Sequence, residues 1–269
     1  MIQISDGEFQ RLVSFVRERY GINLEHKREL VVSRLSLELS RLGYTSYSRY
    51  LDQVISSPEG TQGQQMIDRL STNHTYFFRD EHSLRHLTAT AVPELLSRGC
   101  RHISIWCAAA SSGQECYSIA MELDSCLSLS GPELSFSILG TDINKHVLDQ
   151  ARSGIYDNKE LENIPSRFRR RYTRDQGDGS FAIAPQLRRR VQWQQKNLMQ
   201  PFDFPRPQDL IFCRNVMIYF RPETRRQLVA RLHQALQPGG YLYVGATESI
   251  DMERRYFRYI APTVYRKGG

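Results

Sequence analysis

Apolar positions recur at helical spacing through the first 70 residues of the chain. On the first expected helix they are Phe9, Leu12, Val13, Val16 and Tyr20, the i, i+3, i+4, i+7 spacing of an amphipathic helix. Ser5 and Glu8 form a capping-box pattern before it, and Gly21 is a natural helix end. The same spacing predicts helices over about 25–42, from 45 or 46 to about 55, and over 64–70. We therefore expect an all-helical N-terminal unit.

After about residue 100 the pattern changes to short apolar runs that alternate with helical segments. The expected strands are 103–107, 134–139, 191–196, 209–213, 241–245 and one or two within 257–266, and the expected helices are 115–127, 145–152 and 222–236. This alternation is typical of an α/β fold, a doubly wound and mostly parallel sheet with helices on both faces. We expect a helical domain over residues 1–71 and a sheet domain over residues 72–269.

One segment, about 155–190, interrupts this alternation. Aspartate and glycine residues over 175–179 are typical of a hairpin turn, and 181–184 alternates weakly. The segment therefore predicts a small β-rich insertion. It also carries a cluster of eight arginines: Arg167, Arg169, Arg170, Arg171, Arg174, Arg188, Arg189 and Arg190.

These arginines make the basic charge of the chain local. The net charge is +7, yet the first 70 residues carry nine basic and nine acidic side chains. A local patch favours an acidic protein surface as partner over nucleic acid, which usually needs a wider basic footprint. A solvated face with no partner is the commoner explanation of such a run, and it stays open here.

Composition excludes several classes of protein. With 40% hydrophobic and 24% charged residues, the chain is neither a disordered tail nor a membrane protein. Its start shows no secretory signal. Five cysteines at no zinc spacing are typical of a reduced, cytoplasmic protein. His82 and His86 have the spacing of a zinc helix, but Ser83 stands where such a helix carries glutamate, so we expect no metal.

Two candidate binding positions follow consecutive strands of the expected sheet. The turn over 108–115 is rich in small residues, which let a backbone approach a ligand, although Gly113 is its only glycine. Asp142 ends the next strand, where a carboxylate can accept hydrogen bonds from both hydroxyls of a ribose. A tight strand-to-helix turn and a helix N-cap are the respective structural alternatives. Because no phosphate-binding pattern is present, a nucleoside without a phosphate chain fits better than ATP.

Five motifs give the chain a resemblance to a known family. They are Thr-Asn-His-Thr-Tyr-Phe-Phe-Arg over 72–79, Ser-Ser-Gly-Gln-Glu-Cys-Tyr-Ser-Ile-Ala-Met over 111–121, Ala-Arg-Ser-Gly-Ile-Tyr over 151–156, the run 209–220 ending in Cys-Arg-Asn-Val-Met-Ile-Tyr-Phe, and Leu-Gln-Pro-Gly-Gly over 236–240. In this order and over nearly the whole chain, they resemble the CheR family of chemotaxis receptor methyltransferases. The resemblance implies methyl transfer from S-adenosylmethionine to receptor glutamates, giving glutamyl methyl esters and S-adenosylhomocysteine for sensory adaptation.

The resemblance also implies a role for individual residues. The expected contacts of the cofactor's methionine end are Asn73, Thr75, Arg79 and Glu115, with Arg214 and Asn215 beside them. Asp142 is expected to hold the ribose, and Asn197 and Leu198 to flank the adenine. Tyr219 is expected near the transferring methyl group. Arg79 and Tyr219 are the catalytic candidates, because either could orient the acceptor carboxylate.

The implied partner is the cytoplasmic helical region of chemoreceptors. In the family the second helix offers a basic face to the receptor, and here that face is diluted by Glu29 and Glu38. The turn over 177–179 looks shorter than in members that bind a receptor C-terminal pentapeptide, so we expect no need of that tether. Cys116 replaces the proline usual after Glu115. We expect a monomer that neither binds nucleic acid nor enters the membrane.

Two other functions remain as alternatives. One is a receptor-binding signalling module of the same fold that has lost catalysis, against which the intact set of motif residues argues. The other is an RNA methyltransferase drawn by the arginine cluster, which lacks interleaved aromatic platforms. Phe77 and Phe78 are expected to be core aromatics rather than ligand contacts.

Overall fold

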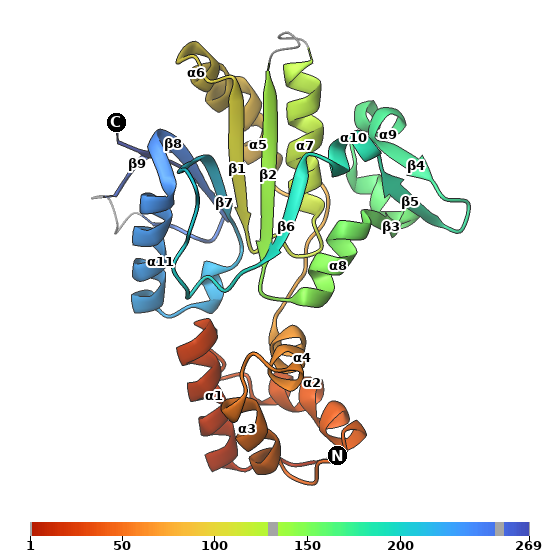
Figure 1. The fold of residues 1–269 in the computed structure, drawn as a ribbon, viewed down its shortest axis with the longest axis vertical. Coiled ribbons are helices and arrows are strands. Elements are labelled where there is room, and N and C mark those ends of the chain that lie inside the picture. The colour runs from red at the N-terminus through yellow and green to blue at the C-terminus, as the bar shows by residue number, and fades with distance from the viewer. Residues whose placement is uncertain (1, 129–133, 251–255, 269) are drawn as a thin grey trace.

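The structure is a computed structural model that describes residues 2–128, 134–250 and 256–268. Figure 1 shows a helical unit at one end of the long axis and a sheet unit at the other. The helical unit consists of α1 (Asp6–Tyr20), α2 (Arg28–Arg41), α3 (Tyr47–Ser56) and α4 (Thr61–Leu70). Ser5 and Glu8 form the expected capping box, and Gly21 ends α1 with a φ of 75°. The unit has a hydrophobic core of its own.

Helix α4 begins three residues earlier than expected, at Thr61 rather than at residue 64. Gly63, which precedes the expected start, lies inside the helix. A Cβ at this position would come within 2.2 Å of the Pro58 carbonyl oxygen, so the glycine allows the helix to pack closely on the preceding loop. At the other end, Arg34 Nη1 donates to the carbonyls of Arg69, Leu70 and Ser71 at 2.8–3.1 Å and caps the helix.

Seven strands form the main sheet, in the order β6-β2-β1-β7-β8-β10-β9. Their bounds are β1 (His102–Ala108), β2 (Ser135–Asp142), β6 (Val191–Gln195), β7 (Gln208–Cys213), β8 (Leu236–Val244), β9 (Phe257–Ala261) and β10 (Val264–Lys267). All neighbouring pairs are parallel except those made by β10, which is antiparallel to β8 and β9. The expected mostly parallel sheet is confirmed. Strand β8 begins at Leu236, before the expected strand over 241–245.

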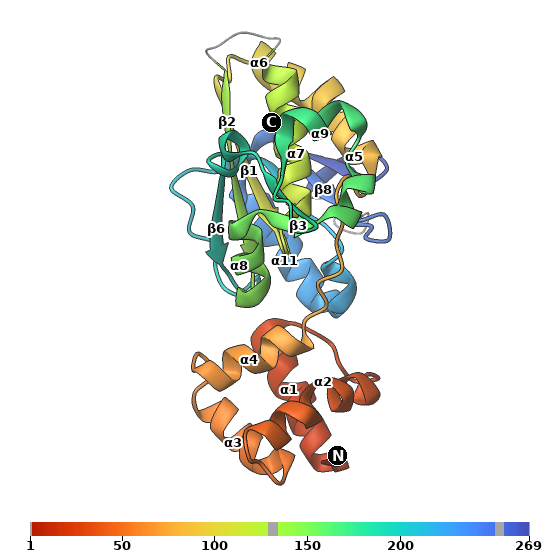
Figure 2. The ribbon, with the colours of Figure 1, turned by 90° about the vertical axis from the view of Figure 1, so that its right-hand side faces the viewer.

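Alternate residues of the central strands enter different hydrophobic cores. On β1, Ile103 and Ile105 join the core that contains α7 (Gln114–Leu127), whereas Trp106 joins the core that contains α11 (Pro222–Ala235). Helices therefore cover both faces, as the two views show (Figures 1 and 2). Helix α8 (Lys145–Ser153) follows β2. The doubly wound prediction is confirmed.

The segment 81–97 is helical, which the apolar pattern did not indicate. It runs as α5 (Glu81–His86), one π-helical turn (Leu87–Ala91) and α6 (Val92–Ser97). Phe77 and Phe78 precede it and are buried in the core, as expected. His86 Nδ1 lies 3.1 Å from the Tyr243 hydroxyl and its ring packs against Tyr241, so this histidine belongs to the interior.

The insertion contains the expected strands and also helices. Its three strands, β3 (Ile155–Asp157), β4 (Thr173–Asp175) and β5 (Ser180–Ile183), form the antiparallel sheet β3-β5-β4. The expected small β insertion is therefore present, and it also contains a 3₁₀ helix (Asn158–Asn163), α9 (Ser166–Tyr172) and α10 (Pro185–Arg188), which the sequence pattern did not indicate. Arg167 pairs with Glu122 and Arg171 with Asp124, each at 2.9 Å, so part of the arginine cluster ties α9 to α7.

No helix within 2–128, 134–250 and 256–268 combines the length and apolar character needed to cross a bilayer.

Candidate active site

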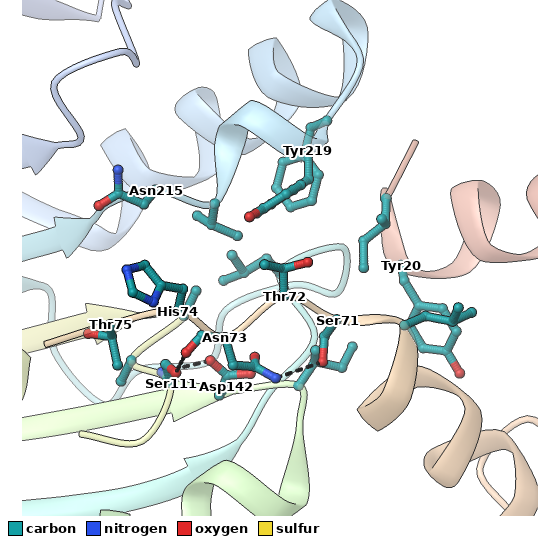
Figure 3. Close-up of a pocket in the computed structure, with 18 of the residues that line it drawn as sticks. Tyr20, Ser71, Thr72, Asn73, His74, Thr75, Ser111, Asp142, Asn215 and Tyr219 are labelled. Atoms are coloured by element: carbon teal, nitrogen blue, oxygen red, sulfur yellow. Dashed lines mark hydrogen bonds between the residues drawn. The ribbon is translucent and has the colours of Figure 1, made fainter. Parts of the chain in front are cut away.

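A pocket of about 350 Å³ lies where the carboxyl ends of the parallel strands face the helical unit (Figure 3). All ten site residues expected from the sequence line it: Asn73, Thr75, Arg79, Glu115, Asp142, Asn197, Leu198, Arg214, Asn215 and Tyr219. They come from the segment after α4 and from the chain after β1, β2, β6 and β7. The carboxyl ends of parallel strands are where open α/β sheets bind ligands. The structure therefore brings together every residue that the motifs singled out.

The turn after β1 has the close-packed backbone expected of it. Ala109, Ser111 and Gly113 all have positive φ angles, of 63°, 50° and 95°. A Cβ on Gly113 would come within 2.8 Å of the Trp193 ring, so only glycine fits there without rearrangement. The Ser111 amide donates to Asp142 Oδ2 at 2.8 Å and ties this turn to the end of β2.

Asp142 is buried and does not cap α8. Its carboxylate accepts hydrogen bonds from the backbone amides of Ser111 at 2.8 Å and Asn144 at 3.0 Å. The cap is Asn144, whose side chain accepts from the Val147 amide, so the N-cap alternative for Asp142 is wrong. Burial raises the pKa of Asp142, although the two amide bonds oppose the rise. The folded protein thus holds this carboxylate in the pocket wall at an energetic disadvantage.

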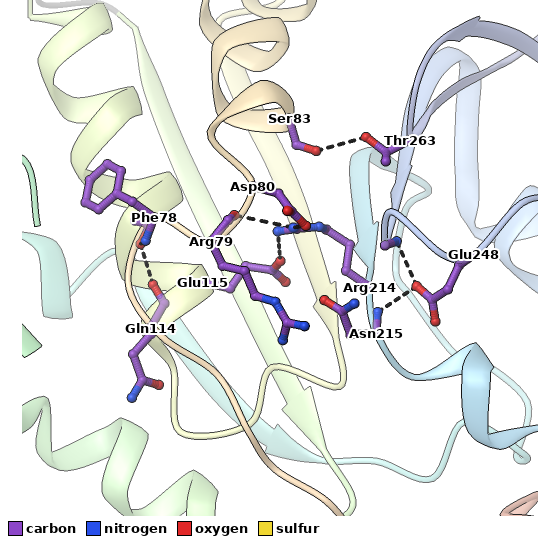
Figure 4. A network of polar contacts seen from close by, with 12 residues as sticks. Phe78, Arg79, Asp80, Ser83, Gln114, Glu115, Arg214, Asn215, Glu248 and Thr263 are labelled. Carbon is purple, nitrogen blue, oxygen red and sulfur yellow. Dashed lines mark hydrogen bonds and ion pairs between the residues drawn. The ribbon is translucent and has the colours of Figure 1, made fainter. Parts of the chain in front are cut away.

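An ion network centred on the buried Arg214 lies beside the pocket (Figure 4). The Arg214 guanidinium contacts Glu115 Oε1 at 2.6 Å and also pairs with Asp80. Arg214 is only 6% exposed. Burial raises the pKa of Glu115, and the positive charge of Arg214 opposes this effect. Among the described residues, Glu115 Oε2 has no hydrogen-bond donor within reach, so this carboxylate keeps acceptor capacity.

Arg79 is positioned by its two neighbours. Phe78 is buried, donates its amide to Ser118 Oγ at 2.9 Å and stacks on Phe168. Asp80 is held by Arg214. Between them, Arg79 Nη1 donates to the His74 carbonyl at 3.1 Å, and its Cζ lies 5.6 Å from the Tyr76 ring centroid. Within the described part of the chain the Arg79 guanidinium forms no ion pair with a carboxylate.

Asn197 and Leu198 contribute differently. Leu198 is a buried apolar part of the wall. Asn197 Nδ2 donates to the Arg19 carbonyl at 2.8 Å, and its Oδ1 accepts from the Met199 amide at 2.9 Å. Both ends of this amide are therefore already bonded within the protein, and they hold the end of α1 against the loop after β6.

The helical unit forms one side of the pocket, which the motifs did not indicate. It contributes Tyr20, Ile22, Asn23, Leu24, Lys27 and Leu30. The Asn23 amide donates to the Tyr219 carbonyl at 2.8 Å, and Ile22 and Phe220 form an isolated antiparallel bridge. Tyr219 itself ends a short 3₁₀ helix (Met217–Tyr219). No sequence signal marks these residues, because their place depends on how two units pack.

Within the described part of the chain, no three His, Cys, Asp or Glu side chains are grouped as the ligands of a metal ion would be.

Family models match the chain in two parts. Residues 7–71 match the all-alpha domain of CheR methyltransferases, and residues 73–266 match their S-adenosylmethionine-binding domain. The chain belongs to the CheR methyltransferase family. Three relatives, each named a chemotaxis protein methyltransferase, are similar over nearly their full length. The protein of Borreliella burgdorferi is 36% identical over 99% of this chain and 96% of its own. Those of Vibrio cholerae (38% identical; 93% and 91%) and Escherichia coli (36% identical; 98% and 92%) match likewise.

Proposed function

We propose that this CheR family member methylates glutamate side chains on the cytoplasmic helical region of chemoreceptors, with S-adenosylmethionine as the methyl donor. The products are glutamyl methyl esters and S-adenosylhomocysteine. One observation carries the proposal: the buried carboxylate of Asp142 and the partly buried carboxylate of Glu115 share a single pocket with Arg79, whose guanidinium forms no ion pair with a carboxylate among the described residues. The relatives are named chemotaxis protein methyltransferases, which supports a protein of the chemotaxis system, here the chemoreceptor, as the substrate.

The residues present fit this donor. Leu24, Ile143 and Leu198 offer apolar wall to a flat base. Each Asp142 oxygen accepts one backbone amide, and a carboxylate oxygen can accept a second bond, so two ribose hydroxyls fit there. The remaining oxygen of Glu115 suits an ammonium group, and Asn73 and Thr75 add polar atoms on the same side.

Little acid–base chemistry is required of the protein. When bound, S-adenosylmethionine supplies a methyl group already activated by its sulfonium. The acceptor glutamate is already ionised at neutral pH, because its ordinary pKa is about 4.3. The task of the chain is to hold the acceptor in line and keep water out, and good orientation can contribute roughly 7–11 kcal/mol of the barrier.

Arg79 and Tyr219 are the residues suited to that task. A guanidinium is a forked donor that fits a carboxylate, and Arg79 has this fork available at the pocket. The Tyr219 phenol lines the same pocket and can donate one further hydrogen bond. Together they would align the acceptor oxygen.

The receptor side of the proposal rests on α2. Its arginines are already engaged: Arg28 with Asp6, Arg34 with the end of α4, and Arg41 with Glu38. This supports a docking face with less free positive charge than a basic helix would offer. We propose, further, a monomeric cytoplasmic protein that needs no receptor pentapeptide.

The proposal is tested in two steps. Calorimetry with S-adenosylhomocysteine should show binding by the wild-type protein. Transfer of a labelled methyl group to a chemoreceptor cytoplasmic fragment should then give a base-labile product, as a carboxyl ester is. Binding without transfer would favour the silent signalling module, and base-stable label on added RNA would favour the RNA methyltransferase.

A further inference from the structure

A buried glutamate outside the pocket organises the chain that carries two pocket residues. Glu248 follows β8 and is 1% exposed. It does not line the pocket, and Figure 4 shows it behind the Asn215 backbone, on the side away from Arg79. No motif pointed to it, and the proposed roles of the other site residues do not use it.

Four backbone amides donate to this one carboxylate. Oε2 accepts from Asn215 at 2.6 Å and from Gly245 at 2.7 Å. Oε1 accepts from Met217 at 2.7 Å and from Ile218 at 3.3 Å. Because β7 and β8 are adjacent parallel strands, Glu248 joins the two segments that leave their carboxyl ends.

The chain after β7 needs such an acceptor. Asn215 has a φ of 58°, a left-handed conformation that turns the chain sharply away from the sheet. The turn directs the amides of residues 215, 217 and 218 to one point away from water, where they would otherwise lack partners. A Cβ on Gly245 would lie 2.6 Å from Glu248 Oε2 and 2.7 Å from Asn215 Nδ2, so the neighbouring glycine makes room for this arrangement.

We propose that Glu248 is a positioning residue, whose carboxylate fixes the backbone of residues 215–219 and thereby sets Asn215 and Tyr219 in the pocket. The inference rests on the proposed function for its kinetic consequence, but its structural part stands independently. Only a carboxylate places two acceptor oxygens at this point. A glutamine would set its NH₂ group against two backbone N–H donors.

Three variants of the full chain test the role of Glu248. Glu248→Gln keeps the shape and removes one acceptor, and Glu248→Asp keeps the charge and shortens the reach. Asp209→Asn is the matched control, because Asp209 also accepts a backbone amide, that of Ser104 at 2.8 Å, but at the opposite end of β7. For each variant we would measure amide hydrogen exchange without ligand, affinity for S-adenosylhomocysteine, and kcat and KM for a receptor fragment. All measurements are made at a temperature well below the unfolding midpoint.

In Glu248→Gln, we expect amide exchange across 215–219 to quicken at least tenfold and kcat to fall about 100-fold, since misplacement of ~1 Å can have that effect. Asp209→Asn should keep both within about threefold of wild type. Unchanged exchange across 215–219, or transfer by Glu248→Gln within threefold of wild type, would overturn the inference. If Glu248→Gln does not fold, the same limits apply to Glu248→Asp. If the wild type itself transfers no methyl group, the proposed function fails, and the exchange measurement alone decides the role of Glu248.

Discussion

Two glutamates that pair with arginine, Glu38 in the helical unit and Glu115 in the pocket, differ in how many of their carboxylate oxygens accept hydrogen bonds. Glu38 on α2 accepts two hydrogen bonds from Arg41, at 2.8 and 3.1 Å, and one from Arg69 at 2.7 Å. These bonds, with that of Arg41 the largest cause, lower its pKa. Among the described residues Glu115 forms an ion pair with Arg214 alone, and burial outweighs the positive charges of Arg214 and Arg79, so the pKa of Glu115 is raised. In the helical unit both oxygens of Glu38 accept hydrogen bonds from arginine. In the pocket only Oε1 of Glu115 does so among the described residues.

The arginines of the two units differ in the same way. Arg34 gives hydrogen bonds to three carbonyls at the end of α4, whereas Arg79 gives one to the His74 carbonyl. A buried or paired charge is therefore a poor marker of function by itself. Unused bonding capacity, directed into a cavity, distinguishes the pocket from the helix interface.

The largest expected effect separates these two arginines. Arg79→Ala should lower methyl transfer about 1,000-fold, because removal of one preorganised donor at a reacting oxygen can cost that much. The unfolding midpoint should hardly change, since among the described residues the Arg79 guanidinium makes one hydrogen bond to a backbone carbonyl and one contact with the Tyr76 ring. Transfer assays and thermal unfolding on the same sample measure both.

Arg34→Ala is its counterpart. It should lower the free energy of unfolding by about 1–3 kcal/mol, because carbonyls at the end of α4 lose their donor. Transfer by the folded molecules should stay near the wild-type rate. Arg34 bonds three carbonyls and Arg79 bonds one. If Arg79→Ala still methylates at close to the wild-type rate, this difference in hydrogen bonding does not reflect function.

A smaller effect is expected at Asp142, and it should separate binding from stability. Because burial raises the pKa of Asp142, the folded state favours its neutral form. Stability linked to this group is therefore fully present at low pH and lost as pH rises through the raised pKa. Asp142→Asn removes the unfavourable buried charge but leaves one of the two amides without its acceptor, so the free energy of unfolding at pH 7 should change by no more than about 1–3 kcal/mol, whereas S-adenosylhomocysteine binding should weaken about 30-fold. Calorimetry and denaturant unfolding measure the two effects, and binding within about threefold of the wild-type affinity would contradict the ribose assignment.

The opposite pH dependence of stability is expected at Glu38. Its lowered pKa means that its contribution to stability is present at neutral pH and lost as pH falls through that lowered value. Glu38→Gln should reduce the free energy of unfolding by about 1–2 kcal/mol at pH 7, with the difference from wild type shrinking below about pH 4.5. Denaturant unfolding at several pH values measures this difference. A deficit that persists unchanged at pH 3 would show that packing rather than charge is responsible.

The sequence predicts features that depend on residues close together in the chain better than features that depend on residues far apart in it. Strand ends and motif spacing placed Asp142 and Glu115 correctly at one edge of the sheet, since that edge follows from a local alternation. Periodicity missed the start of α4, because the reason for Gly63 lies in its contact with Pro58. It also missed Glu248, whose four donors come from residues about 30 positions away or across a turn. The side of the pocket around Tyr20 was missed for the same reason, because it depends on how the helical unit packs against the sheet unit.

The smallest expected effect concerns the surface of α2 that a receptor would contact, because the arginines of this helix are already engaged within the helical unit. Leu37 on α2 is 80% exposed, while Arg28, Arg34 and Arg41 are engaged within the unit. A receptor helix that docks on α2 should then meet an apolar contact more than an ionic one. Partial burial of one leucine is worth about 1 kcal/mol, so Leu37→Gln should raise KM for a receptor fragment about three- to fivefold.

Two controls sharpen that last prediction. Ile155, 44% exposed in the insertion, is an apolar surface residue on the other unit, and Ile155→Gln should leave KM unchanged. Affinity for S-adenosylhomocysteine should be the same in both variants. KM for the wild type should also vary little between low and high salt, because exposed ion pairs are screened and apolar contacts are not. A steep salt dependence with no effect of Leu37→Gln would mean that charges outside α2 hold the receptor, and the arginines of the insertion would then be the surface to substitute.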